Sequence, residues 1–232
     1  MIYVYAITEA SSAGTSVRGI DARPVSFITC GELVAACSEH ERKPEASEEA
    51  LVEHESVVEA LMRSGTVIPM RFGQVEEEIS QLRDRVDRCS TTITAALERL
   101  RGRVEIGVRA FALQSPPRSE PAATTPTGAS GHTYMTSRLR QERIARKLQE
   151  DGQEIAEELH GKLDGLAETS TLKARRGRMV MAGAYLVPKA MVDDFIALVQ
   201  QLTRDYLGKL ELVSTGPWPP YSFVDVHFDA RG

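Results

Sequence analysis

The chain has 232 residues, a length that accommodates one large domain or two small ones. With 42% hydrophobic and 26% charged residues it can bury a core without disulfides or metal ions. Its net charge of −5 argues against a dedicated nucleic-acid-binding protein, because such domains are usually basic.

The chain opens with a predicted strand over residues 2–7, Ile-Tyr-Val-Tyr-Ala-Ile. No basic stretch precedes this apolar run, so it does not resemble a signal peptide. No apolar run approaches the ~20 residues needed to cross a bilayer. Two short apolar segments, 24–29 and 33–37, then flank Gly31 and Glu32, a pair that suits a tight hairpin turn. We therefore expect a cytoplasmic protein, without a membrane partner, that begins with β-structure.

The next predicted element is a helix that begins after Ser47, a good N-cap, and ends at Gly65. Its apolar positions recur at helical spacing and include His54. A short buried strand is expected over 66–70. A long helix is expected over 76–101, because apolar residues alternate there by three and four positions. Residues 104–113 alternate in polarity like a strand with one solvated side.

The composition changes over residues 114–131, which are rich in Pro, Ser, Thr, Ala and Gly and predict a mobile loop. The second half then reads as strand 104–113, helical region 132–167, strands 168–174 and 179–187, helix 189–206 and strand 209–214. This βαββαβ order is typical of a ferredoxin-like fold with an enlarged first crossover.

These elements predict an α+β protein of two domains. We expect a mixed α+β domain over residues 1–103 and a modified ferredoxin-like domain over 104–214, with the mobile loop 114–131 and the helical insert 132–167 inside it. Residues 215–232 are expected to form a C-terminal tail that packs between the domains.

The side chains with reactive chemistry do not form a recognisable site in the sequence. The three cysteines, Cys30, Cys37 and Cys89, have no CxxC spacing and are expected to be buried free thiols. His54 has no second ligand three or four residues away, so we interpret it as a hydrogen-bonded interior histidine. Common nucleophile, phosphate-binding and zinc-protease motifs are missing. We therefore expect no catalytic residue, metal ion or cofactor, and no enzymatic activity.

Four segments together resemble the gas vesicle protein F/L family. They are Tyr3-Val4-Tyr5-Ala6-Ile7, the stretch from His54 through Val67-Ile68-Pro69-Met70-Arg71-Phe72-Gly73, Ala184-Tyr185-Leu186-Val187, and Gly216-Pro217-Trp218-Pro219-Pro220-Tyr221-Ser222-Phe223-Val224. The last segment is the most specific, because three prolines around a tryptophan rarely arise from core packing. The resemblance implies a two-domain α+β fold and a role in building or lining the shell of gas vesicles. It also implies that the shell protein and other accessory gas vesicle proteins are partners.

Two motifs are candidate interaction sites. Gly216, Pro217, Trp218, Pro219, Pro220 and Tyr221 are expected to be extended, with two aromatic anchors that either clamp the domains together or dock a partner. The second motif is Pro69, Arg71, Phe72 and Gly73. Arg71 emerges there at a strand end, where it either makes a structural contact or binds a ligand.

The leading functional hypothesis is an accessory protein in gas vesicle formation. It would bind shell or accessory proteins as a scaffold, a chaperone-like factor or a minor structural component. The alternative is a small-molecule-binding module with a cleft near Arg71. The basic residues between Lys173 and Arg178 could contact nucleic acid or an acidic partner. We interpret them instead as a solvated strand end or an intramolecular partner for the glutamates of 154–158, because the chain as a whole is acidic.

Overall fold

The computed structural model describes residues 1–9, 17–113, 152–173 and 178–225. The chain divides into two compact units, one made of residues 1–105 with 217–232 and the other of residues 106–216. Each unit has its own antiparallel sheet and helices, so the protein has a mixed α+β fold. The predicted loop 114–131 and residues 132–151 of the predicted helical insert lie outside the described residues.

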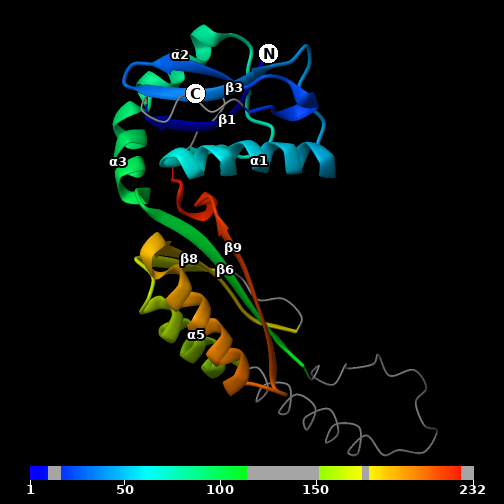
Figure 1. Ribbon diagram of the computed structural model, residues 1–232, viewed down its shortest axis with the longest axis vertical. Helices are drawn as coiled ribbons and strands as arrows, with labels where there is room; N and C mark the ends of the chain where they lie inside the picture. Colours follow the sequence, from blue (N-terminus) through cyan, green and yellow to red (C-terminus); the bar gives the residue numbers. More distant parts are fainter. Residues whose placement is uncertain (10–16, 114–151, 174–177, 226–232) are drawn as a thin grey trace, which may run out of the picture. The chain divides into compact units, whose positions relative to one another are not determined.

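The sheet of the first unit contains five strands, β1 (Ile2–Glu9), β2 (Ser26–Cys30), β3 (Leu33–Glu39), β4 (Val67–Pro69) and β5 (Val75–Glu76). Their order is β2-β3-β1-β4, and β5 also pairs with β1 (Figure 1). The predicted hairpin is confirmed, because Cys30 pairs with Leu33 across the two-residue turn. Gly31 has φ +60° in this turn, a value that glycine adopts without steric cost. A short 3₁₀ helix, η2 (Ile20–Ala22), precedes β2.

The first helix of this unit, α1 (Glu48–Ser64), begins and ends where the sequence predicts. The side chain of Ser47 accepts a hydrogen bond from the amide of Ala50 at 3.1 Å, as an N-cap residue does. The C-cap residue is Gly65. Local capping chemistry was therefore sufficient to place both ends of this helix.

The prediction of one helix over 76–101 is wrong. Residues 75–76 belong to β5, and two helices follow, α2 (Ile79–Arg88) and α3 (Ser90–Leu100). The break lies at Cys89, whose ψ of 4° is not helical and whose amide is shared between the carbonyls of Arg85 and Val86. Ser and Thr follow directly, and these residues favour helix ends over helix interiors because their side chains compete for backbone groups. The spacing of apolar residues continues across the break, which is why periodicity did not reveal it.

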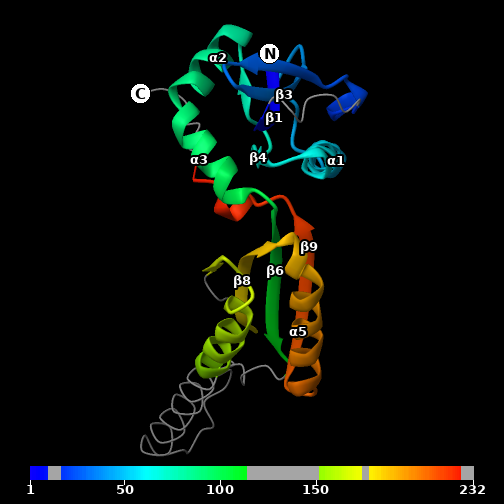
Figure 2. The ribbon, with the colours of Figure 1, turned by 60° about the vertical axis from the view of Figure 1, so that its left-hand side comes forward.

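Helices cover both faces of the first sheet. Figure 2 shows α1 on one side and the α2–α3 pair on the other. The face toward α1 is rich in aromatic residues, and its buried cluster includes Tyr3, Tyr5, Ala36, Val57 and Leu61. This face carries most of the polar contacts described below.

The second unit contains β6 (Arg103–Ala112), β7 (Thr169–Leu172), β8 (Met179–Pro188) and β9 (Leu210–Trp218), in the order β7-β8-β6-β9. The helical residues 152–164 and helix α5 (Val192–Asp205), preceded by η3 (Lys189–Met191), cover one face of this sheet (Figure 2). The core between them is apolar and contains Leu159, Leu163, Tyr185, Phe195 and Val199.

Strand β9 is longer than predicted. The sequence suggested that the last strand stops at residue 214, whereas β9 continues through Gly216 and Pro217 to Trp218. Pro217 is tolerated because β9 lies at the edge of its sheet, where a missing amide hydrogen leaves no ladder partner unpaired. None of the helices in the described part of the chain is both long and apolar enough to span a bilayer.

Candidate functional site

The segment after β4 uses its backbone to hold the aromatic face of the first sheet. Pro69 pairs with Ala6, and the amide of Met70 donates to the carbonyl of Tyr5 at 2.8 Å. The amide of Gly73 then donates to the hydroxyl of Tyr3 at 3.1 Å. Gly73 has φ +87°, so a residue with a β-carbon would be strained at this turn.

His54 of α1 is the centre of this face. Its Nε2 lies 3.0 Å from the carbonyl oxygen of Met70, and its Nδ1 lies 2.9 Å from the hydroxyl of Tyr3. Because a carbonyl only accepts, Nε2 carries the proton and Nδ1 accepts from Tyr3. Burial lowers the pKa of His54 to about 4, despite the opposing effect of the Met70 carbonyl. His54 is therefore a neutral, fully hydrogen-bonded interior histidine, which confirms the interpretation from the sequence.

The two side chains of the predicted Arg71–Phe72 pair have different environments. The ring of Phe72 packs edge-on against Tyr3 and His54, with centroid distances of 5.8 and 5.9 Å. The side chain of Arg71 is exposed. The structure thus brings Phe72, Gly73 and Pro69 together with the aromatic face and leaves Arg71 outside it. Whether Arg71 binds a ligand stays a prediction.

The C-terminal motif contacts the same aromatic face. The hydroxyl of Tyr221 lies 3.4 Å from Nε2 of His54. Burial raises the pKa of Tyr221, and the nearby Glu55 carboxylate raises it further. Pro219 and Pro220 are buried, whereas Trp218 remains 41% exposed. Tyr221 is therefore an intramolecular anchor, while much of the Trp218 ring faces solvent.

The residues after Tyr221 add a second set of contacts within the first unit. The amide and the hydroxyl of Ser222 both donate to the carboxylate of Glu105, at 2.8 and 2.7 Å. The guanidinium of Arg99 donates to the carbonyl of Phe223 at 2.8 Å, and the Phe223 ring is buried. These residues form the short helix η4 (Tyr221–Phe223). The sequence resemblance included Ser222 and Phe223 but gave no indication of Glu105 or Arg99 as their partners.

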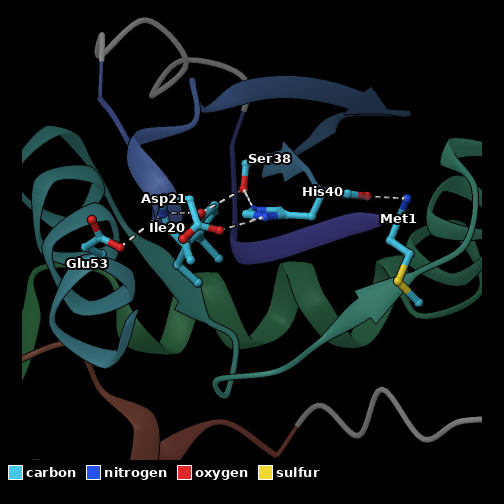
Figure 3. A network of polar contacts seen from close by, with 7 residues as sticks. Met1, Ile20, Asp21, Ser38, His40 and Glu53 are labelled. Carbon is cyan, nitrogen blue, oxygen red and sulfur yellow. Dashed lines mark hydrogen bonds and ion pairs between the residues drawn. The ribbon is translucent and has the colours of Figure 1, made fainter. Parts of the chain in front are cut away.

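A further polar network, which sequence reasoning missed, lies on the same side of the sheet (Figure 3). The Ser38 hydroxyl lies 2.8 Å from the Tyr5 hydroxyl and 2.8 Å from Nε2 of His40. Nδ1 of His40 lies 3.7 Å from the carboxylate of Asp21. His40 directly follows β3 and is buried, although its neighbours along the chain are polar. Only the pairing of β3 with β1 brings Ser38 and His40 to Tyr5, and no local pattern reports that pairing.

The short helix η2 is joined to this network by two backbone hydrogen bonds. The amide of Ile20 donates to the Tyr5 hydroxyl at 3.0 Å, and the amide of Asp21 donates to the carboxylate of Glu53 at 3.1 Å. Asp21 and Ala22 both have φ +54°, an uncommon value for residues with a β-carbon. A β-carbon on Gly19 would lie 2.1 Å from the Tyr5 hydroxyl, so this position has room only for glycine.

The chemistry of these groups favours structural roles. Burial raises the pKa of Tyr3 and of Tyr5, and it lowers the pKa of His40, so these groups stay neutral at pH 7. Within the described residues, no three His, Cys, Asp or Glu side chains converge in a way that could hold a metal ion. The arrangement is suited to holding the C-terminal segment and presenting a surface.

Comparisons with known proteins place this chain in a family. The family model for the gas vesicle synthesis protein GvpL/GvpF matches residues 1–225. Gas vesicle protein L of a Streptomyces species is 29% identical over 97% of this chain and 92% of its own length. Gas vesicle protein F of Haloferax mediterranei is 23% identical over 99% of this chain and 95% of its own length.

Two solved structures have a similar fold. The crystal structure of GvpF from Microcystis aeruginosa matches with a TM-score of 0.76 and 22% identity, covering 96% of this chain and 98% of that one. GvpF from Anabaena matches with a TM-score of 0.79 and 19% identity, covering 100% and 98%. Since the family model spans nearly the whole sequence, this chain belongs to the GvpL/GvpF family of gas vesicle synthesis proteins.

Proposed function

We propose that this chain acts in gas vesicle formation by binding gas vesicle proteins, as a scaffold, a chaperone-like factor or a minor structural component, and that it catalyses no reaction. Membership in the family carries the general role in gas vesicle formation. The proposed partners are the shell protein and other accessory gas vesicle proteins. A shell that encloses gas needs very apolar subunits, which would aggregate in water without a binding partner.

The partly exposed Trp218 is the observation that supports binding through the C-terminal motif. Its neighbours Pro219 and Pro220 are buried and fix the backbone, so the indole is held on a rigid support. Tryptophan is enriched among residues that dominate binding energy, because a large apolar ring loses little entropy when it is buried. The motif thus combines an intramolecular anchor, Tyr221, with an aromatic group available to a partner.

We also propose that the second unit is a modified ferredoxin-like domain, as the element order of the sequence predicts. The strand order β7-β8-β6-β9 corresponds to 2-3-1-4 within this unit. Helical residues 152–164 lie between β6 and β7, and α5 lies between β8 and β9. This combination supports the proposal, since a βαββαβ chain of that strand order places both helices on one face.

Capture of the purified shell protein by this chain tests the proposed function. We expect Trp218→Ala to weaken capture by at least about tenfold, which corresponds to ~1.4 kcal/mol. Leu207→Ala is the matched control, because Leu207 is an apolar side chain that is 81% exposed in the second unit, and its loss should leave capture unchanged. Equal capture by the wild type and Trp218→Ala would contradict a role of the C-terminal motif in binding the shell protein.

Deletion of the gene, followed by flotation of the vesicles, tests the wider role. We expect few or no floating vesicles in the deletion strain and recovery when the wild-type chain is returned. Immunodetection of the chain in floated wild-type vesicles would favour a structural component over a transient assembly factor. Vesicles that form in normal number and shape without the chain would contradict a role in assembly.

A further inference from the structure

The sheet of the second unit has two edges of different length. In the order β7-β8-β6-β9 the outer strands are β7 and β9, and Figure 2 shows β9 beside β6 with none of the described strands on its other side. Strand β7 has four residues, whereas β9 has nine. A long edge strand presents a row of backbone amides and carbonyls that can pair with a further strand. The edge formed by β9 is therefore the one that is open to strand addition.

Two contacts with β6 determine which backbone groups of β9 point away from the sheet. The amide of Leu113 donates to the carbonyl of Lys209 at 3.0 Å, and a β-carbon on Gly107 would lie 2.7 Å from Oγ1 of Thr215. The spacing from Lys209 to Thr215 equals that from Gly107 to Leu113, so both contacts belong to one antiparallel register. Successive residues of a strand direct their backbone groups to opposite sides. The even-numbered residues of β9 therefore direct their amides and carbonyls away from β6.

The side chains of β9 alternate between two faces of the sheet. Leu210 belongs to the core under the helices and Leu212 packs against it, so the even-numbered side chains face the helices. The odd-numbered side chains Glu211, Val213 and Thr215 lie on the face that the described helices leave uncovered, and all three are exposed. Val213 is 38% exposed although it is apolar and β-branched. Such a side chain at the centre of an edge strand is stabilised when a further strand packs beside it.

The centre of β9 lacks the features by which edge strands usually avoid pairing. Charged side chains and prolines are the common ones. The stretch from Leu212 to Gly216 reads Leu-Val-Ser-Thr-Gly, and the nearest charge and proline, Glu211 and Pro217, lie on either side of it. The opposite edge, β7, is short and lies between Glu168 and Lys173. Only the β9 edge thus combines length with an uncharged centre.

We propose that β9 pairs with β9 of a second copy of this chain, antiparallel and about a two-fold axis at Val213, which joins the two sheets into one. In this register Val213 faces Val213 of the other copy, Leu212 faces Ser214, and Glu211 faces Thr215. Leu212 and Ser214 direct their backbone groups outward, so they exchange hydrogen bonds across the axis. Val213 forms a non-hydrogen-bonded pair, in which the two side chains approach most closely. No like charges face each other.

A second copy is a better occupant than an unrelated strand because this edge is complementary to itself. The register with β6 places Arg109 opposite Val213, and its side chain is exposed on the same face as that of Glu211. Each copy thus brings one cation and one carboxylate to the axis, so the pairing gathers no net charge there, although the whole chain carries −5. Antiparallel pairing of a strand with itself also gives a closed two-fold dimer, the commonest symmetry of oligomers. This inference goes beyond the proposed function, since it needs neither Trp218 nor a shell protein.

Sedimentation equilibrium of the full chain tests the proposal. We expect a reversible dimer with Kd of about 1 to 100 μM, because edge pairing buries less area than a standard interface. Val213→Lys places two ammonium groups opposite each other and should raise Kd at least about tenfold. Thr171→Lys is the matched control, since it makes the same change of charge at an exposed position of β7 and should alter Kd less than about twofold. A thermal unfolding curve of each variant verifies that it is folded.

Mixing two charge variants tests the register. Val213→Glu alone should be monomeric like Val213→Lys, but an equimolar mixture of the two should form a heterodimer, because opposite charges then face each other across the axis. A mixture of Val213→Glu with Thr171→Lys should stay monomeric. A wild-type chain that is monomeric up to about 1 mM would overturn the proposal. So would a dimer that Val213→Lys leaves intact, equal weakening by Val213→Lys and Thr171→Lys, or a mixture of the two position-213 variants that does not associate.

Discussion

The hydroxyl of Tyr221 lies 3.4 Å from Nε2 of His54, a residue 167 positions earlier in the chain. The same nitrogen donates to the carbonyl of Met70, so one histidine joins α1, the segment after β4 and the C-terminal motif. The carboxylate of Glu55, the next residue of α1, lies near this hydroxyl and raises the pKa of Tyr221 in addition to the effect of burial. Packing of the C-terminal segment is therefore coupled to the core of the first unit.

Tyr221→Phe should destabilise the first unit by about 1 kcal/mol, because it removes the hydroxyl that contacts His54 but keeps the ring. Urea unfolding followed by tryptophan fluorescence measures this change, since Trp218 is the only tryptophan of the chain and adjoins the motif. Tyr206→Phe is the matched control, because its hydroxyl bonds to an exposed Glu158, and its effect should stay below ~0.5 kcal/mol. Equal effects of the two changes would contradict the role assigned to Tyr221.

Lowering the pH should destabilise the first unit through His54. Its folded-state pKa of about 4 lies below the ordinary value of 6.5, so the unfolded chain binds the proton more readily. The stability that neutral His54 contributes is complete above pH 6.5 and is lost as the pH falls toward 4, by up to about 3 kcal/mol. Urea midpoints at a series of pH values measure this dependence.

His54→Gln is the control for the pH experiment. Its amide can still donate to the Met70 carbonyl but does not titrate, so we expect lower stability at pH 7 and a flatter pH dependence. Burial raises the pKa of Glu55, so this carboxyl makes the protein more stable as the pH falls. Glu55 is present in both proteins, so its contribution cancels when the two pH profiles are compared. Parallel pH profiles for the wild type and His54→Gln would mean that His54 does not carry the effect.

Gly19→Ala should destabilise the protein by about 1 to 3 kcal/mol, because the new β-carbon would lie 2.1 Å from the hydroxyl of the buried Tyr5. Gly161→Ala should instead stabilise the protein, raising its free energy of unfolding by about 0.5 to 1 kcal/mol. Position 161 is helical, and an added β-carbon there meets nothing within 4 Å. Thermal unfolding of the two variants checks both signs, and a neutral Gly19→Ala would show that Tyr5 can move aside.

Glu105→Gln should loosen the C-terminal segment, because the carboxylate accepts from both the amide and the hydroxyl of Ser222. Hydrogen bonds to a charged acceptor are stronger than neutral ones, so we expect a loss of about 1 to 2 kcal/mol. The emission of Trp218 should shift toward that of a solvated indole. Glu211→Gln, at an exposed position of β9, provides the control and should leave the emission unchanged.

The sequence by itself determined the features that depend on neighbours along the chain. Alternating polarity predicted β6, the Ser47 cap and Gly65 predicted the ends of α1, and the pair Gly31-Glu32 predicted the hairpin. Four segments together, of which the residues around Trp218 are the most specific, indicated the family resemblance, which the match over residues 1–225 confirmed. Each of these signals comes from residues that are close in sequence. For such residues the local backbone geometry determines which side chains share a face and which can cap a helix or form a turn.

Only the tertiary structure decided which distant residues meet. It placed Tyr221 beside His54, buried His40 against Ser38 and joined Ser222 to Glu105. It also broke the predicted long helix at Cys89, although the apolar spacing on the two sides remains in register. Contacts of this kind depend on how whole helices and strands pack together. Side chains that look equivalent in a local sequence pattern acquire different partners only once the sheet is formed.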